Sequence, residues 1–173
     1  MVIRGSRGLI AAGFADFSLI AFHFQKAGSV SAIGIPLLYS FAMATGALAA
    51  IVFGRLFDRL GISMVLLAFF LAAFFAPLVF LGGFSLALLG MVLWGIGIGA
   101  QDSLLKAVLT GVTPVEKRST AFGVFDTGFG IAWFLGSAAM GFLYDVSLPA
   151  LIAFSVVSQL AALPVFFLAR KRS

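Results

Sequence analysis

Asp16 and His23 are the first residues in the sequence whose types and spacing could support proton chemistry. They stand nearly two helical turns apart, so in a helix they would share one face, about 10 Å apart along its axis. A carboxylate and an imidazole in that arrangement could carry a proton. The alternative is that Asp16 is hydrogen-bonded inside the protein and that His23 lies near the end of its helix.

Gln101, Asp102, Lys106 and Asp126 form a second group of polar residues in apolar surroundings. Asp102 precedes Lys106 by one helical turn, in the acid-first order that favours an ion pair. We expect these groups to lie at similar depth, as a substrate or proton site or as a neutralised network that joins two helices. For Asp102 and Lys106 we favour a structural ion pair, and for Asp126 both interpretations stand.

The stretch Gly54–Gly61, GRLFDRLG, concentrates charge in a chain of which only 10% of the residues are charged. Its first five residues read Gly-x-Leu-aromatic-Asp, and the same frame recurs as GFLYD at Gly141–Asp145. The glycines suit a tight turn, and Asp58 could cap the helix that follows. The arginines occur only in the first copy.

Several classes of site are excluded by the residues that the sequence lacks. Because it has no cysteine and only one histidine, thiolate and histidine-rich metal sites are excluded. No paired-aspartate motif is visible, and a serine–histidine pair would have to use His23. The glycine-rich run WGIGIGA (94–100) has no strand before it, unlike a dinucleotide-binding motif. We therefore expect no enzyme activity, no cofactor and no metal.

The composition indicates where these residues must be placed. Hydrophobic residues make up 62% of the chain, 21 residues are Phe, and the mean hydropathy is +1.20. A soluble domain of this length has too little interior to bury so much apolar surface. The net charge of +5 does not indicate nucleic-acid binding, because the basic residues stand at the ends of apolar segments. The sequence therefore predicts an all-α protein in a lipid bilayer.

A membrane-spanning helix needs about 20 apolar residues, and six runs of that kind are present. The first is the weakest, because Asp16 and His23 interrupt it, and its basic start also resembles a signal peptide. We favour a spanning helix, because the apolar run before Asp16 is short. The predicted spans are Gly8–Phe24, Val30–Phe53, Ile62–Leu81, Phe84–Leu105, Ser119–Tyr144 and Leu148–Leu168.

Six spans place almost all of the 11 Lys and Arg residues on one side of the membrane. That side holds Arg4, Arg7, Arg55, Arg59, Lys106, Lys117, Arg118, Arg170, Lys171 and Arg172. The other side holds only Lys26. Because basic loops stay in the cytoplasm, we expect a multi-pass protein of the cell inner (plasma) membrane with both termini in the cytoplasm.

The two Gly-x-Leu-aromatic-Asp copies end the second and the fifth predicted spans, which cross the membrane in opposite directions. This relation predicts a 3+3 inverted repeat, an architecture known in transporters. The repeat halves are about residues 1–83 and 84–173, within one six-helix domain of residues 1–173.

GRLFDRLG with the following Ile62 and Ser63 resembles the loop signature of the major facilitator superfamily, Gly-x-Leu-x-Asp-Arg-x-Gly-(Arg/Lys)-(Arg/Lys). The matching positions are Gly54, Leu56, Asp58, Arg59 and Gly61. Ile62 and Ser63 depart from the signature, which has two basic residues there. The region from Pro114 to Asp145 is similar to the fourth-to-fifth span region of that family. As a whole, the chain resembles the C-terminal six-helix half of bacterial members.

The resemblance implies one half of a twelve-helix fold, and a secondary transporter that moves a small solute by alternating access, with proton coupling as an option. The second half would come from a parallel homodimer or from a separate partner chain. The competing hypothesis is an accessory or vestigial six-helix membrane protein without transport activity of its own.

The resemblance also implies roles for single residues. It makes Asp58 part of a gate that contacts the opposite half, with a plain helix cap as the alternative. The gating loop comprises Gly54, Asp58, Arg59 and Gly61. Because the first span lines the central cavity in that family, a substrate or proton pathway is expected there. Asp16 and His23 lie in that span, and with Gln101, Asp102 and Asp126, the polar residues of the fourth and fifth spans, they are the candidates for a substrate or proton pathway.

Overall fold

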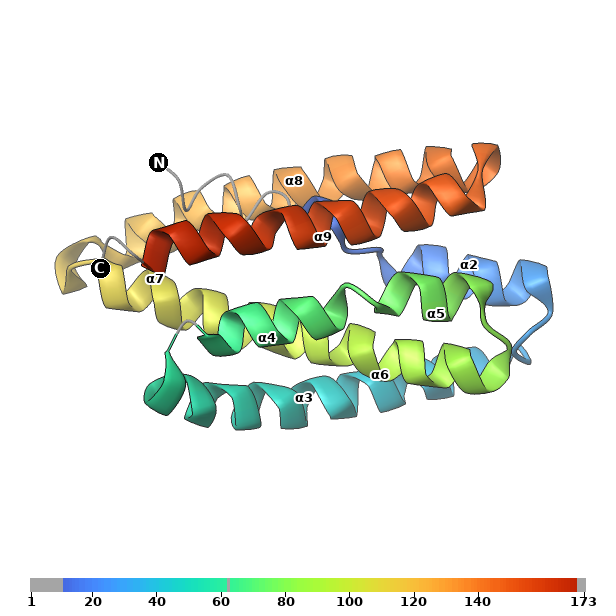
Figure 1. Ribbon diagram of the computed structural model, residues 1–173, viewed down its shortest axis with the longest axis horizontal. Helices are drawn as coiled ribbons and strands as arrows, with labels where there is room; N and C mark the ends of the chain where they lie inside the picture. The colour runs from blue at the N-terminus through green and yellow to red at the C-terminus, as the bar shows by residue number, and fades with distance from the viewer. Residues whose placement is uncertain (1–10, 62, 171–173) are drawn as a thin grey trace.

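A computed structural model describes residues 11–61 and 63–170, and the regular elements in that part of the chain are all helical. The predicted cytoplasmic residues Arg4, Arg7, Lys171 and Arg172 lie outside the described residues. The helices run roughly along one direction (Figure 1). This arrangement agrees with the predicted all-α class.

From Phe17 to Arg170, the described part of the chain forms four long helices and four shorter ones. The long ones are α3 (Gly34–Leu60), α6 (Phe84–Ala100), α8 (Arg118–Val146) and α9 (Leu148–Arg170). The shorter ones are α2 (Phe17–Ala27), α4 (Ser63–Ala72), α5 (Phe75–Leu81) and α7 (Lys106–Val112). A π-helical turn, η1 (Gln101–Leu105), joins α6 to α7, and a 3₁₀ turn, η2 (Val115–Lys117), precedes α8.

Within the described residues, three helical stretches are long and apolar enough to cross a membrane, and two shorter apolar stretches accompany them. The three are Gly34–Leu60, Phe84–Gly111 and Val115–Val146. The two shorter ones are Leu66–Leu81 and Leu148–Pro164. These stretches follow the order of the second to sixth predicted spans. The count of six spans and the 3+3 repeat stay predictions.

The first predicted span is not one continuous helix. Residues 11–13 are helical, the chain is irregular from Phe14 to Asp16, and α2 then runs to Ala27. The prediction of one helix over Gly8–Phe24 is therefore wrong at its centre and stops short of the helix end. Asp16 is the last residue of the interruption and the N-cap of α2, the helix that contains His23.

The third predicted span is also divided, and here the sequence contains the cause. Helix α4 ends at Ala72 and α5 begins at Phe75, two residues before Pro77. A proline has no N–H to donate, and its ring clashes with the carbonyl four residues before it, here that of Ala73. Proline is tolerated in the first turn of a helix, which is where α5 places it.

Helices α3 and α6 cross at backbone contact. A Cβ atom added to Gly46 would lie 2.7 Å from the carbonyl oxygen of Gly95. Cβ atoms added to Gly95 and Gly99 would overlap the carbonyl oxygens of Ala42 and Gly46. Small residues permit such close packing between helices in lipid, and this crossing fixes α6 in the centre of the bundle.

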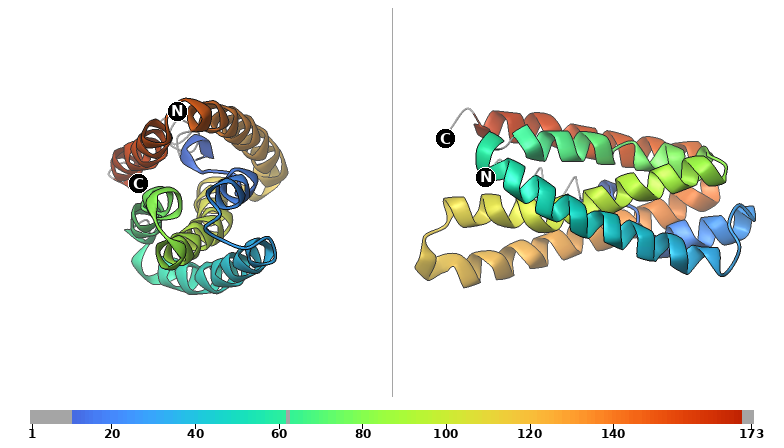
Figure 2. Two further views of the ribbon diagram at one scale, coloured as in Figure 1. Left: turned by 90° about the vertical axis from the view of Figure 1, so that its right-hand side faces the viewer. Right: turned by 90° about the horizontal axis from the view of Figure 1, so that it is seen from below.

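Seen end on, the helices form a curved wall, and α2 lies at one side between α3 and α8 (Figure 2). Close contacts join α2 to α3, and a hydrogen bond joins it to α8. Most of α8 is exposed, including Val124, Ile131, Phe134 and Phe142. The described residues therefore leave the face formed by α2, α3 and α8 largely uncovered.

Candidate functional site

Asp16 immediately precedes a helix that begins in the middle of the first predicted span. It is the N-cap of α2, with φ −67° and ψ 146°, and its side chain is exposed and makes no capping hydrogen bond. The N–H groups of Leu19 and Ile20 donate to the backbone carbonyl of Asp16, at 3.1 and 3.3 Å. A carboxylate is favoured at this position, because a helix N-terminus carries partial positive charge.

Side chains from two other helices bind the carbonyl groups at this interruption. Trp94 of α6 donates its indole N–H to the carbonyl oxygen of Ala15 at 2.9 Å. Ser155 of α9 donates its hydroxyl to the carbonyl oxygen of Gly13 at 2.6 Å, and Gln159 donates its amide to the same oxygen at 3.3 Å. These polar groups are buried, so the interruption is satisfied by protein side chains within the bundle.

His23 lies in α2 and its side chain is buried, whereas Asp16 at the N-terminus of the same helix is exposed. A hydrogen bond of 3.0 Å joins its Nδ1 atom to the hydroxyl of Tyr144, and its ring packs edge-on against Phe80 at 5.0 Å. The ammonium group of Lys26 lies 5.1 Å from the centre of the Tyr144 ring. The structure therefore pairs His23 with the GFLYD copy, and Asp16 and His23 do not share an exposed face.

Gln101 begins the π-helical turn η1, and it is buried. Neither its amide nitrogen nor its amide oxygen has a hydrogen-bond partner among the described residues. A π-helical turn inside an α-helix is uncommon and is frequently found at functional sites. Gln101 is therefore a buried amide that is left without a partner in a locally irregular helix.

Asp102 and Lys106 lie on the exposed side of the same helix. The Nζ atom of Lys106 is 3.7 Å from Oδ1 of Asp102, which is the spacing of the ion pair expected for these two residues. Asp126 is exposed on α8, and within the described part of the chain no hydrogen bond or ion pair joins it to Gln101 or Asp102. The structure thus brings Asp102 and Lys106 together but does not connect Asp126 to them.

The prediction of a tight turn at GRLFDRLG is wrong, because all but the last residue of this stretch are helical. Gly54 to Leu60 form the last turns of α3, and only Gly61 leaves the helix, with φ +59°. A Cβ atom on Gly54 would meet no described residue within 4 Å, so that glycine serves no close approach to the described part of the chain. Asp58 and Arg59 are exposed, and Asp58 forms no hydrogen bond or ion pair with any residue that the structure describes.

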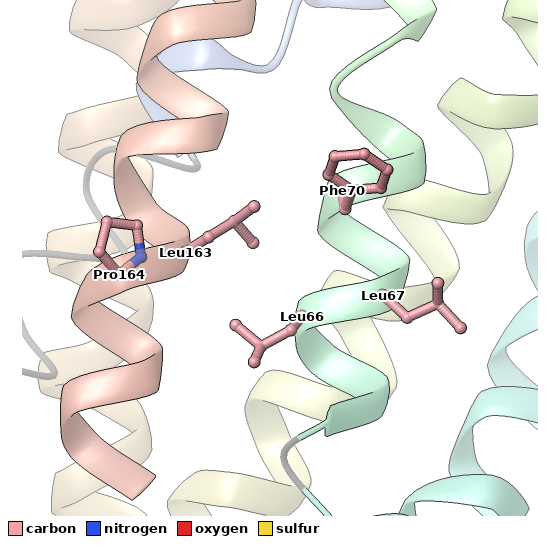
Figure 3. A pocket seen from close by; sticks show the side chains of 5 residues that line it. All are labelled: Leu66, Leu67, Phe70, Leu163 and Pro164. Carbon is pink, nitrogen blue, oxygen red and sulfur yellow. The ribbon is translucent and has the colours of Figure 1, made fainter. Parts of the chain in front are cut away.

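The hollow between α4 and α9 is not a candidate for a polar solute. Its volume is about 510 Å³, and the side chains that face it are apolar (Figure 3). They belong to Leu66, Leu67, Phe70, Leu163 and Pro164. Ligand sites orient a solute through a few placed polar groups, and these residues offer none.

Trp94, Ser155 and Gln159 are absent from the candidates chosen from the sequence. Ser155 and Gln159 stand four residues apart in an apolar helix, and this spacing indicates a polar pair on one helix face. That signal could have identified them. The partner of Trp94, the carbonyl of Ala15, is a backbone atom distant in sequence and leaves no signal in the residue pattern.

Comparison with known proteins gives relatives over nearly the full length of the chain. It is 31% identical over 166 residues to the uncharacterized protein Rv2265 of Mycobacterium tuberculosis, which covers 96% of this chain and 41% of the relative. The same values hold for the uncharacterized protein Mb2288 of Mycobacterium bovis. The chain thus spans about two-fifths of the length of these relatives. No solved structure matches it.

A relative from an archaeon and a family model point to the same group. The uncharacterized MFS-type transporter MJ1560 of Methanocaldococcus jannaschii is 26% identical over 95 residues, which covers 54% of this chain and 25% of the relative. The model of the Major Facilitator Superfamily matches residues 7–173. Together with the helical fold and the GRLFDRLG signature, this match shows that the chain belongs to the Major Facilitator Superfamily.

Proposed function

We propose that this chain forms a six-helix half of a secondary transporter, which moves a small solute across the cell inner membrane by alternating access. Family membership supports a transporter and not an enzyme. The basic residues support the proposed orientation, because Arg59 ends α3 at one end of the bundle and Lys26 ends α2 at the other. Both termini then face the cytoplasm.

The observation that carries this proposal is the exposed carboxylate of Asp16 at the interruption of the first span. Ionisable groups within a membrane span are costly and mark pathways for substrates or ions. Interrupted helices that direct their N-termini toward a site at mid-membrane are a feature of transporters. An accessory protein without transport would have no need for an exposed carboxylate there.

The uncovered face formed by α2, α3 and α8 is where a second six-helix unit would pack. A second copy of the chain or a separate six-helix segment would supply it. Asp58 and Arg59 at the end of α3 would then act as the gate, with Asp58 contacting the second unit. Its lack of a partner among the described residues supports this role. Gly54 and Gly61 would allow the close approach of that unit.

Within this half, Asp16 carries the coupling proton, and Gln101 contacts the solute. The observation that supports this role is that the Gln101 amide is buried and has no hydrogen-bond partner among the described residues. Asp126 extends the pathway along the exposed face of α8. His23 contributes through Tyr144 and not through a direct contact with Asp16. The pair Asp102–Lys106 remains a structural ion pair at the surface.

Proton-coupled transport can be tested without knowing the solute in advance. The protein, with any co-purifying partner, is reconstituted into vesicles that contain the pH indicator pyranine. Sugars, amines, carboxylates and amino acids are then added one class at a time under an imposed proton gradient. We expect at least one class to accelerate proton entry, and Asp16→Asn to abolish that effect.

Asp145→Asn is the matched control, because Asp145 is an exposed carboxylate at the end of α8, outside the proposed pathway. It should leave the solute-dependent proton entry within about twofold of the unmodified protein. If no solute class changes proton entry in the unmodified protein, proton-coupled transport is wrong. Equal loss in both variants would remove Asp16 from the pathway.

A further inference from the structure

The residues at the interruption of the first span do not by themselves require a break. Phe14, Ala15 and Asp16 include no proline and no glycine, and the glycine before them has no left-handed conformation. Alanine is the best helix former, and phenylalanine is tolerated in helices. Asp16 is a favoured N-cap residue, but nothing in these three residues forces a break, so the contacts around them decide whether it forms.

The backbone hydrogen bonds show where the helical pattern fails. In a regular helix the N–H of Leu19 would donate to the carbonyl of Ala15, four residues earlier. Here it donates to Asp16 at 3.1 Å, and the indole of Trp94 takes its place on Ala15 at 2.9 Å. The indole N–H of Trp94 thus replaces a backbone N–H as the donor to the carbonyl of Ala15.

A second pair of side chains holds the carbonyl before the break. Ser155 and Gln159 both donate to the carbonyl oxygen of Gly13, and the Gln159 amide also donates to the Ser155 hydroxyl at 3.3 Å. The position is tightly packed, because a Cβ atom on Gly13 would lie 2.7 Å from Cβ of Ser158. In a regular helix that carbonyl would accept the N–H of Phe17 instead.

Aromatic packing fixes the indole in the orientation that this hydrogen bond needs. The Trp94 ring lies 6.0 Å from the ring of Phe14 and 6.1 Å from that of Phe17, so residues on both sides of the break contact it. The Phe14 ring lies in turn against Gly97 of the same helix as Trp94. The residues on both sides of the break therefore pack closely against α6.

We propose that Trp94, Ser155 and Gln159 are positioning residues that keep the first span interrupted and thereby hold Asp16 at the N-terminus of a separate helix. They act through the backbone of Gly13 and Ala15 and do not touch Asp16. Without their hydrogen bonds, the regular bonds from Phe17 and Leu19 re-form, and Asp16 moves from a helix end into a helix interior. This proposal rests on the proposed function in one respect, which is that the proposed function assigns the coupling proton to Asp16.

The position of residue 16 can be measured without transport, because the native chain has no cysteine. A thiol at a helix N-terminus has a larger thiolate fraction and therefore reacts faster at neutral pH. The alkylation rate of Asp16→Cys by iodoacetamide at pH 7 is compared with that of Gln25→Cys, an exposed position in the last turn of α2. We expect residue 16 to react about 2- to 5-fold faster, the size of a helix-terminus effect.

The ratio of these two rates is then measured with each positioning residue changed. Trp94→Phe keeps an aromatic ring but removes the N–H, and should bring the ratio close to one. Trp133→Phe is the control, because the Trp133 indole makes no hydrogen bond within the described residues, and its ratio should not change. Ser155→Ala, a smaller change, should lower the ratio partway. It provides a second test if Trp94→Phe does not fold.

A ratio of one in the otherwise unmodified protein, or a ratio that Trp94→Phe and Ser155→Ala both leave unchanged, would overturn the proposal. Transport supplies an independent readout. If Asp16 carries the proton, Trp94→Phe should shift the pH profile of transport, whereas Trp133→Phe should not. A normal alkylation result with no transport by any variant would refute the proposed function and leave the positioning role intact.

Discussion

His23 and Tyr144 are distant in the sequence, and their hydrogen bond joins the C-terminal half of α2 to α8. Tyr144→Phe removes one hydroxyl and leaves a buried imidazole nitrogen without a partner. Such a loss costs about 1–3 kcal/mol, so we expect a lower free energy of unfolding in denaturant titrations of the protein in detergent.

Tyr39→Phe is the control for this change, because the Tyr39 hydroxyl makes no hydrogen bond within the described residues, and its ring only packs on Phe17 and Trp94. It should alter the free energy of unfolding by less than about 0.5 kcal/mol. Equal effects of the two substitutions would mean that the His23–Tyr144 bond does not stabilise the protein.

Gln101 presents the opposite case, since its buried amide makes no hydrogen bond among the described residues. Gln101→Leu removes polar atoms at similar side-chain volume, so we expect the free energy of unfolding to rise by about 1–3 kcal/mol. If Gln101 contacts the solute, the same substitution should reduce solute-dependent proton entry. Stability gained with function lost is the result expected of a residue kept for binding.

Gln25→Leu changes an exposed glutamine at the end of α2 and serves as the comparison. It should leave both stability and proton entry nearly unchanged. A Gln101→Leu protein that is less stable than the unmodified one would show that the amide has a structural partner.

At the scale of helices, the crossing of α3 and α6 depends on glycines. A Cβ atom on Gly95 would overlap the carbonyl oxygen of Ala42, and that oxygen belongs to the backbone and cannot easily move. Gly95→Ala should therefore separate the helices and cost about 1–3 kcal/mol. Gly123→Ala in α8, where a Cβ atom would meet nothing within 4 Å, should instead stabilise its helix by up to about 1 kcal/mol. Thermal unfolding of both variants in detergent measures the difference, and equal melting temperatures would contradict this role of the crossing.

The sequence was sufficient to place most of the helices but not to find the break in the first one. The long apolar runs predicted α3, α6, α8 and α9 to within a few residues at most ends, because length and hydropathy are local properties. The division of the third span at Pro77 also has a local cause. The break at Phe14–Asp16 depends on Trp94, Ser155 and Gln159, which lie far away in sequence, and no local pattern contains that information.

The site was predicted in part for the same reason. Asp16 and Gln101 could be chosen from the sequence, because polar residues within apolar spans are conspicuous. The structure leaves Asp16 exposed and buries His23 against Tyr144, a difference in environment that their spacing of seven residues did not indicate. Which side chains are buried within this chain, and which are exposed, followed only from the packing of the helices.

At the scale of the whole molecule, the uncovered face of α2, α3 and α8 predicts the location of a second six-helix unit. Arg55 is exposed near the end of α3, one helical turn before Asp58, and so lies on the same side of that helix.

A photoreactive cross-linker attached to Arg55→Cys should link to the second unit, whether another copy or a separate segment, when the protein is illuminated in its membrane. Phe70→Cys, exposed beside the apolar hollow between α4 and α9, should give no such product, because that side faces lipid in the proposed arrangement. Peptide mapping of the linked product identifies the partner of this face. If Phe70→Cys forms the product and Arg55→Cys does not, the second unit packs on the opposite side, and Asp58 cannot be the gate.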